Sequence, residues 1–237
     1  MGEIPISSRD GRSVSLNQPF EVRFYLREPE RSRTYFARRF PDLAVRSDRL
    51  EFRVPGYIPI NHEDPANWRS ASFVVDYHDP VFARIRKALG RDFSIKPSVA
   101  QLAAFVNGYI EHKNLSRGYD VASSVARDQT GDCTEHAVLF AAVARLTGYS
   151  ARVVHGILFH SQGTDLRAFG HAWTEVYSDG SWHPFDATRP DTAIDRSYLP
   201  LYLLTDESAL YNSAMLTPML LTLPQSIELE LGNSVPN

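Results

Sequence analysis

Apolar and charged residues alternate in two stretches of the first quarter of the chain. Apolar side chains occupy every second position over residues 20–26 and 50–54, and mostly charged residues stand between them. A period of two is typical of a strand that buries one face. The sequence therefore predicts that residues 1–75 form a β-rich N-terminal region, with its strands within 13–58.

After this region the apolar spacing changes to that of helices. Asp79 and Pro80 form a favourable helix start, and Gly90 is expected to end this first helix. Apolar residues then recur three or four positions apart over residues 99–110 and 121–126. We therefore expect two more helices in these segments.

The next segment begins with Thr130-Gly131-Asp132-Cys133-Thr134-Glu135. Strongly apolar residues follow, so a buried helix is expected to continue over residues 137–146 and to end at Gly148. Residues 151–159 are rich in valine and isoleucine and predict a buried strand. The polar residues 161–170 predict a loop after that strand.

A strong hairpin signal lies at Asp179-Gly180, between the predicted strands 171–177 and 182–186. A two-residue turn at this pair would make His171 and Asp186 diagonal neighbours on one face of the sheet. Their Cβ atoms would then lie roughly 7 Å apart or less. A three-residue turn would shift the register by one and place the two side chains on opposite faces. The proximity of the two residues therefore depends on this turn.

Other apolar segments predict short strands at 73–75, 198–204 and 227–231. We therefore expect the β-rich N-terminal region to be followed by a second domain at 76–237.

Composition limits the possible functions. The 237 residues are 43% hydrophobic and 22% charged, and the net charge of −3 argues against nucleic-acid binding. The single cysteine excludes an intrachain disulfide and a cysteine-based zinc cluster. The sequence has no apolar run of about 18 residues and no signal-like N-terminus, so we expect no membrane span and no signal peptide. The compartment stays open between the cytoplasm and, if a signal had been removed, the periplasm.

Cys133 stands where a helix is expected to begin. Asp132 and Glu135 have the spacing of a capping box, which makes Asp132 the N-cap and places Cys133 in the first turn. Free N–H groups and the positive end of the helix dipole favour a thiolate there, and the same N–H groups could bind an oxyanion. The alternative is an inert buried thiol, which is common for a free cysteine.

The chain offers eight histidines as a base for this thiolate. We prefer His171, because the hairpin register places it beside Asp186, a carboxylate that would orient the ring and stabilise its cation. The alternative is a structural histidine at a strand end. His136 is the rival base, since it lies three residues after Cys133 on one helix face, although helix packing explains it as well. The remaining histidines lack the spacing of a zinc site, so no metal is expected.

Three motifs follow one another along the chain: Gly131-Asp132-Cys133-Thr134-Glu135-His136-Ala137, Gly170-His171-Ala172-Trp173-Thr174-Glu175-Val176 and Trp182-His183-Pro184-Phe185-Asp186-Ala187-Thr188. Their order and spacing resemble the transglutaminase-like superfamily, and the resemblance covers about residues 98–190. It implies an α+β fold with a papain-like core, in which a cysteine-bearing helix packs on an antiparallel sheet. It also implies a catalytic triad of Cys133, His171 and Asp186 and acyl chemistry through a thioester.

This resemblance leaves the reaction open. Transfer of the acyl group to water would make the protein a cysteine peptidase or amidase, whereas transfer to a lysine amine would make it a protein-glutamine transglutaminase. A non-catalytic binding module that retains the fold is the third alternative. The sequence lacks a D-x-D-x-D-G calcium loop, which favours a bacterial-type hydrolase that acts on a peptide or protein substrate without a cofactor. The oligomeric state is left open.

A second oxyanion donor, besides the amide of Cys133, is expected from the chain upstream of the cysteine. The resemblance to the superfamily implies such a donor. Asn114 and Tyr119 are the candidates in this sequence, and spacing does not select between them. Gln129 lies closer to Cys133 in sequence, but we do not expect it to turn back far enough.

Overall fold

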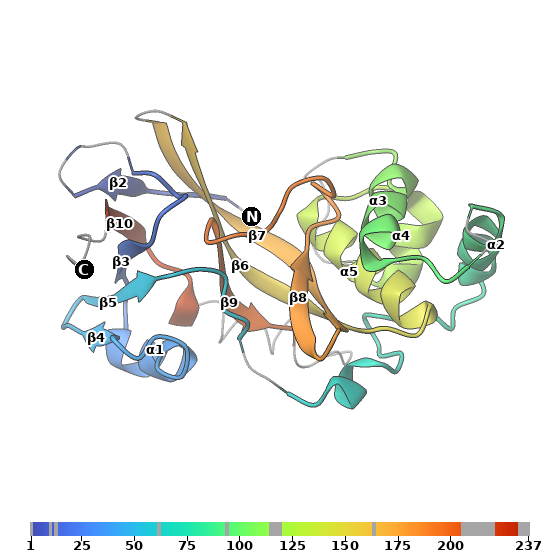
Figure 1. Cartoon of the computed structure of the whole chain (residues 1–237), viewed down its shortest axis with the longest axis horizontal. Coiled ribbons are helices and arrows are strands. Elements are labelled where there is room, and N and C mark those ends of the chain that lie inside the picture. Colours follow the sequence, from blue (N-terminus) through green and yellow to red (C-terminus); the bar gives the residue numbers. More distant parts are fainter. Residues whose placement is uncertain are drawn as a thin grey trace.

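The structure is a computed structural model, which describes residues 2–9, 11, 14–60, 63–92, 95–113, 120–162, 165–204 and 221–231. Three blocks lie along its longest axis (Figure 1). A sheet with a helix beside it forms one end, a second sheet lies in the middle, and a group of helices forms the other end. We call these blocks the terminal sheet, the central sheet and the helical end.

The described helices and strands confirm the α+β class. In chain order they are β1 (Glu3–Ile4), β2 (Ile6–Ser8), β3 (Phe20–Tyr25), α1 (Pro29–Phe36), β4 (Ala44–Val45), β5 (Arg49–Val54), the 3₁₀ helix η1 (Pro65–Trp68), α2 (Phe82–Asp92), α3 (Val99–Tyr109), α4 (Ala122–Asp128), α5 (Cys133–Leu146), β6 (Ser150–Gln162), β7 (Asp165–Ser178), β8 (Ser181–Phe185), β9 (Tyr198–Leu203) and β10 (Ser226–Leu231).

The terminal sheet has the strand order β2-β10-β3-β5-β4. The apolar residues of β3 and β5 are buried and the charged residues between them are not, so the predicted alternation is confirmed. Helix α1 covers this sheet, and its last residue, Phe36, packs against Phe24 and Phe52 with ring centroids 5.9 and 5.5 Å apart. An aromatic cluster therefore forms the core between helix and sheet.

Hydrogen bonds join the terminal and central sheets at several points. Strand β10 lies between β2 and β3, although Glu228 and its ion-pair partner Arg23 are 205 residues apart in sequence. Strand β1 pairs instead with β7 of the central sheet. Arg39, just after α1, donates a hydrogen bond of 2.5 Å to the carbonyl of Pro200 in β9. The division into domains 1–75 and 76–237 stays a prediction, and these bonds cross it.

The central sheet has the order β1-β7-β6-β9, and β8 also pairs with β7. Strands β6 and β7 form one long hairpin whose pairing extends to Gln162 opposite Asp165. The loop predicted over 161–170 is therefore wrong. Polar side chains in this segment belong to an exposed part of the hairpin, where Arg167 forms an ion pair of 3.1 Å with Glu3 of β1. Polarity here marks solvent exposure rather than the absence of a strand.

Two smaller predictions are also wrong. Residues 73–75 form bends instead of a strand, and the carbonyl of Val74 accepts a hydrogen bond from the amide of Ala122 at the start of α4. Helix α2 passes through Gly90 and ends at Asp92. A glycine inside a helix costs only about 1 kcal/mol relative to alanine, so it does not have to end one.

Helix α5 packs on the central sheet through apolar side chains and two hydrogen bonds. The Thr174 hydroxyl donates to the carbonyl of Ala137 at 2.9 Å, and Arg145 donates to the carbonyl of Ala151 at 2.8 Å. Gly148, at a φ of 85°, follows the helix as expected. Although α5 is strongly apolar, no helix in the described part of the chain is both long and apolar enough to cross a bilayer.

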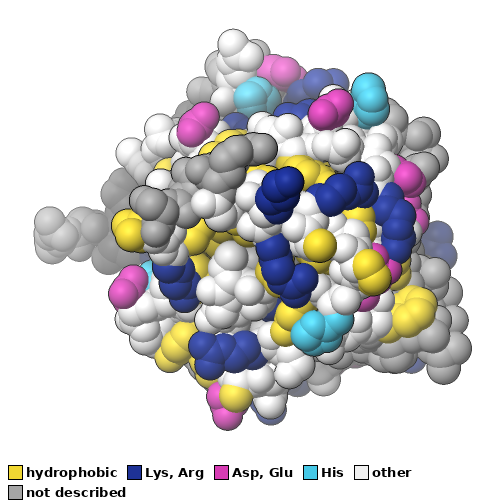
Figure 2. Space-filling model, turned by 90° about the vertical axis from the view of Figure 1, so that its right-hand side faces the viewer, with side chains coloured by type: hydrophobic (Ala, Val, Ile, Leu, Met, Phe, Trp, Pro, Cys, Tyr) yellow, Lys and Arg dark blue, Asp and Glu magenta, His cyan; other side chains and the backbone are white. Residues whose placement is uncertain are grey.

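The helical end of the molecule faces the viewer in Figure 2. Lys and Arg side chains extend across the centre of this view among apolar ones. Helix α2, which lies outermost at this end in Figure 1, contributes the exposed side chains of Arg84, Arg86 and Lys87. The net charge of −3 is therefore unevenly spread over the surface.

Candidate active site

The hairpin that carries the predicted histidine and carboxylate has the expected two-residue turn. Ser178 pairs with Ser181. Asp179 and Gly180 between them adopt φ values of 50° and 82°, as a type I′ turn requires. The predicted register is therefore confirmed, and the histidine and the carboxylate lie on the same face of the sheet.

His171 lies at a gap along one edge of β7. On that edge β1 pairs with Ala168 and Phe169, and β8 pairs from Thr174 onward. Among the described strands, none pairs with the edge between these two partners. His171 itself is buried, and its ring contacts Cys133, the first residue of α5.

Asp186 directly follows β8 and accepts four hydrogen bonds. Its Oδ2 accepts from His171 Nε2 at 2.7 Å and from the Tyr198 hydroxyl at 2.8 Å. Its Oδ1 accepts from the amide and the hydroxyl of Thr188 at 2.8 and 2.6 Å. Burial raises the pKa of Asp186, but these bonds and the charge of His171 outweigh burial and lower the pKa to about 2. The carboxylate is therefore ionised and fixed in one orientation.

His171 connects this carboxylate to the cysteine. Burial lowers the pKa of His171, whose side chain is almost fully covered. Hydrogen bonds to Asp186 and Cys133 and the negative charges of both partners outweigh burial and raise the pKa to about 9. At neutral pH the ring is therefore an imidazolium. Since Nε2 is bound to Asp186, Nδ1 is the nitrogen left for the sulfur. The structure thus brings all three predicted residues together, and their catalytic roles stay a prediction.

Cys133 is the first residue of α5 and is half-buried. The predicted capping box is confirmed, because the Asp132 carboxylate accepts from the Thr134 amide at 2.8 Å and Glu135 accepts from the Asp132 amide at 2.9 Å. Gly131 is required before this box, since a Cβ there would lie 2.2 Å from the Cβ of Glu135. Amides of the first turn have no carbonyl within the helix to bind, so the start of α5 can attract negative charge.

Two aromatic side chains surround the His171 ring. The ring centroid of Trp173 lies 6.2 Å away with an interplanar angle of 29°, and that of Tyr198 lies 5.8 Å away. Burial and the charge of Asp186 raise the pKa of Tyr198, so its hydroxyl stays protonated and donates to the carboxylate. Sequence reasoning missed Tyr198, because it reaches the site only through the pairing of β9 with β6, and no local signal marks it.

A buried polar network lies behind Trp173. Its indole donates to the Tyr57 hydroxyl at 2.9 Å, and that hydroxyl donates to Glu175 at 2.6 Å. Arg152 donates to the other oxygen of Glu175 at 2.7 Å, and its guanidinium lies 4.0 Å from the ring centroid of Trp182. The Arg152 and Glu175 side chains have no exposed surface. This network fixes the indole of Trp173, which packs beside the His171 ring.

His136, the rival base, is placed for packing. Its Nδ1 donates to the carbonyl of Asp132 at 2.6 Å, and only 1% of the residue is exposed. Burial lowers the pKa of His136, so the ring is neutral at pH 7. Hydrogen bonds to Cys133 and Asp186 raise the pKa of His171. Among the described residues, no hydrogen bond joins His136 to either of these two side chains.

The second oxyanion donor stays undefined. The side-chain amide of Gln129 donates to the carbonyl of Tyr109 at 3.0 Å, so it is engaged away from the sulfur. Asn114 and Tyr119 lie outside the described residues. Within the described ranges, no group of three or more His, Cys, Asp or Glu side chains could hold a metal ion.

The segment that carries the three site residues matches a known family. Residues 87–187 fit the family described as the transglutaminase-like superfamily. This segment begins within α2, ends just after Asp186 and includes α3, α4, α5 and the β6–β8 strands. The match covers less than half of the chain and agrees with the resemblance that the three motifs indicated. The match supports cysteine-dependent chemistry in general and does not separate hydrolysis from acyl transfer to an amine.

Three solved structures are distantly similar. A candidate cysteine protease from Cytophaga hutchinsonii shares 15% identity over 73% of this chain and 72% of its own, with a TM-score of 0.46. The periplasmic domain of TgpA from Pseudomonas aeruginosa, bound to ethylmercury, shares 21% identity over 60% of this chain and 55% of its own, with a TM-score of 0.38. Another structure of that domain shares 18% over 60% and 53%, with a TM-score of 0.37. No curated protein sequence matches the chain.

Proposed function

We propose that this protein is a cysteine hydrolase that cleaves a peptide or amide bond through a thioester at Cys133. The observation that carries the proposal is the position of His171, which contacts Asp186 on one side and Cys133 on the other, at the start of a helix. A thiol, an imidazole and a carboxylate in series form the usual arrangement of an activated nucleophile. The presence of all three argues against a non-catalytic binding module.

Acylation begins with the attack of the Cys133 thiolate on the substrate carbonyl carbon. A sulfur–carbon bond forms, and the carbonyl π electrons move to the oxygen. The amide of Cys133 and the positive end of α5 stabilise this oxyanion. The His171 imidazolium then donates its proton to the leaving amine, the carbon–nitrogen bond breaks, and a thioester remains. Asp186 holds the ring in position throughout.

Deacylation transfers the acyl group to water. The neutral His171 ring removes a proton from water while the water oxygen attacks the thioester carbonyl. The carbon–sulfur bond then breaks, which releases a carboxylic acid and restores the thiolate and the imidazolium. A lysine amine in place of water would give transglutamination. We favour water, because the sequence lacks the calcium loop of calcium-activated cross-linkers.

The first experiment measures the reaction of Cys133 with iodoacetamide from pH 5 to 9 by intact mass. A thiolate paired with an imidazolium should be alkylated well below pH 8, whereas the alkylation rate of an ordinary thiol reaches half its maximum at about pH 8.5. His171→Ala should move the alkylation profile to higher pH. His183→Ala, on β8 of the same hairpin, is the matched control and should leave the profile unchanged. An ordinary profile in the unmodified protein would contradict an activated thiol.

The second experiment separates hydrolysis from transfer. The protein is incubated with a mixed-sequence library of peptide amides that includes glutamine, together with a fluorescent alkylamine. The hydrolase proposal predicts release of ammonia or peptide fragments without amine incorporation, as measured by mass spectrometry. Cys133→Ala should abolish this release. Amine incorporation would replace the hydrolase proposal with a transglutaminase, and an alkylated but inactive protein would favour a binding module.

A further inference from the structure

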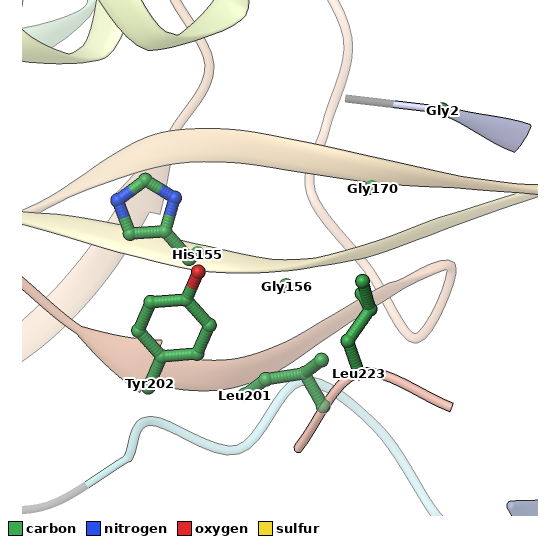
Figure 3. A pocket seen from close by; sticks show the side chains of 7 residues that line it. All are labelled: Gly2, His155, Gly156, Gly170, Leu201, Tyr202 and Leu223. Carbon is green, nitrogen blue, oxygen red and sulfur yellow. The ribbon is translucent and has the colours of Figure 1, made fainter. Parts of the chain in front are cut away.

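An apolar cavity of about 200 Å³ lies against the strands that carry the site (Figure 3). Leu201 and Tyr202 of β9 and Leu223 form its apolar wall, and the backbones of β6 and β7 at Gly156 and Gly170 close another side. Leu223 is 37% exposed and is one of few large apolar side chains that the described surface exposes to this degree. The cavity is therefore open to solvent beside an exposed leucine.

The position of this cavity relates it to His171. Gly170 immediately precedes His171 in β7, and Gly156 is its cross-strand partner in β6. Directly paired residues in a sheet have Cα atoms only about 4.5–5.5 Å apart. The cavity therefore adjoins the backbone at His171, and the charge of His171 acts on His155 in its lining.

The lining of the cavity suits an uncharged group. His155 is the one titratable base among the lining residues, and it stacks on Tyr202 with ring centroids 5.0 Å apart. Burial, and to a smaller degree the charge of His171, lower the pKa of His155 to about 3. The imidazole is therefore neutral at pH 7. A charged group in this cavity would lose its hydration without gaining an ionic partner from the lining residues.

The size of the cavity limits the ligand to about one side chain. An engineered apolar cavity of about 150 Å³ is sufficient to hold benzene, whereas drug-sized ligands occupy pockets of about 300–1,000 Å³. A volume of about 200 Å³ therefore accommodates one branched aliphatic or one aromatic side chain.

We propose that this cavity binds the uncharged side chain of a substrate residue near the scissile bond, a residue such as leucine or phenylalanine. This inference rests on the proposed function, because it requires a peptide substrate at Cys133. The thiol and the imidazolium would then supply the chemistry, while Leu201, Tyr202 and Leu223 would select the substrate.

The test measures alkylation of Cys133 by the N-iodoacetyl derivatives of glycine, leucine, phenylalanine, aspartate and lysine amides, with and without a glycine spacer. The sulfur forms a bond to the reagent carbon and iodide leaves. Each rate is divided by the rate of the same reagent with glutathione, which removes differences in intrinsic reactivity. We expect the leucine or phenylalanine reagents to react at least about tenfold faster than the glycine reagents. The charged reagents should gain no such advantage, and equal corrected rates for all reagents would overturn the proposal.

Leu223 and Leu231 provide a matched pair of variants, because both leucines are 37% exposed and only Leu223 lines the cavity. Leu223→Trp should fill the opening and reduce the leucine-to-glycine rate ratio to near one. Leu231→Trp should keep the ratio of the unmodified protein. Leu223→Ala should widen the opening and shift the preference from leucine towards phenylalanine. An unchanged ratio in Leu223→Trp would overturn the proposal.

A binding measurement separates failure of the cavity from failure of the thiol chemistry. Ligand-observed NMR with N-acetyl-leucine amide and the Cys133→Ala variant should show line broadening that Leu223→Trp removes and Leu231→Trp does not. Binding without any alkylation of Cys133 would refute the cysteine mechanism and support the cavity. Alkylation without a leucine preference, together with no NMR binding, would refute the cavity and support the mechanism.

Discussion

The central sheet contains an ion pair that is completely buried, whereas the ion pairs of the terminal sheet are at least partly exposed. Arg9 and Glu230 are 2.6 Å apart on the terminal sheet, with side chains 52% and 29% exposed. Arg152 and Glu175 are also 2.6 Å apart on the central sheet, with no exposed side-chain surface. A surface pair contributes about 0–1 kcal/mol, but breaking a buried pair costs about 3–5 kcal/mol because a charge is left without compensation. The two ion pairs therefore have the same N–O distance but contribute differently to the free energy of unfolding.

The largest effect is expected from the groups for which we propose a chemical role. Cys133→Ala should lower turnover by about 10⁴-fold or more, and His171→Ala should do nearly the same, since triad members act as a unit. The midpoint of thermal unfolding of Cys133→Ala, followed by circular dichroism, should stay close to that of the unmodified protein. His183→Ala is the control for the histidine variant. Near-normal turnover by Cys133→Ala would refute the mechanism.

The next largest effect is expected from breaking the buried ion pair between Arg152 and Glu175. Arg152→Met should lower the free energy of unfolding by about 3–5 kcal/mol, because it removes one partner of a buried ion pair. Urea denaturation measures the loss. Adding Glu175→Gln to Arg152→Met should restore part of it. A loss below about 1 kcal/mol would place this pair in the same class as Arg9–Glu230 and remove the contrast between the sheets.

Asp186→Asn should change the pH dependence of turnover. In the unmodified protein, kcat/KM should fall as the pH rises through about 9, because His171 loses the proton that it donates to the leaving amine. Without the Asp186 charge, the pKa of His171 should fall towards its usual value of 6.5, so the alkaline limb should move to lower pH. Turnover at pH 8 should fall, but by less than for Cys133→Ala. An alkaline limb that stays near pH 9 would contradict this role of Asp186.

Tyr198→Phe should have a smaller effect on the same site. It removes one of the four hydrogen bonds to Asp186 and leaves the aromatic ring in place. A charge-assisted bond contributes about 1.5–3 kcal/mol, so kcat should fall about tenfold or somewhat more, with little change in KM. Tyr177→Phe, on the hairpin that carries His171, is the control. A change confined to KM would assign Tyr198 to substrate binding.

The smallest effect is expected at the surface of the terminal sheet. Glu230→Gln should lower the free energy of unfolding by less than about 1 kcal/mol, because its pair with Arg9 is partly hydrated and screened by salt. A double-mutant cycle with Arg9→Gln, measured at low and high salt, gives the pair energy. A coupling above about 2 kcal/mol would show that the terminal sheet also depends on its charges.

Features set by neighbouring residues could be predicted from the sequence. The turn at Asp179-Gly180 fixes the register of β7 and β8, because these residue types accept positive φ values. The capping box of α5 depends only on Asp132 and Glu135. Both features lie next to site residues, so the sequence could place Cys133 at a helix start and His171 beside a carboxylate.

Features set by distant partners could not be predicted. Helix α1 has no apolar period and is stabilised by the packing of Phe36 on the terminal sheet. The polar half of the β6–β7 hairpin is a strand because the two chains pair there. Tyr198 and the cavity beside His171 depend on β9, whose place in the central sheet no local pattern encodes. The cavity that we propose selects the substrate therefore could not be predicted from neighbouring residues.

The position of β10 also sets an order of assembly during synthesis. Strand β3 cannot pair with β10 until β10 has been synthesised, and Glu228 of β10 lies 205 residues after Arg23 of β3. At about 5–20 residues per second, that wait lasts on the order of ten seconds or longer. Until then β3 lacks one neighbour and presents an open edge that can recruit other nascent chains. The β7–β8 hairpin, which emerges earlier, can close first, so we expect newly made protein to depend on chaperones mainly while the terminal sheet is incomplete.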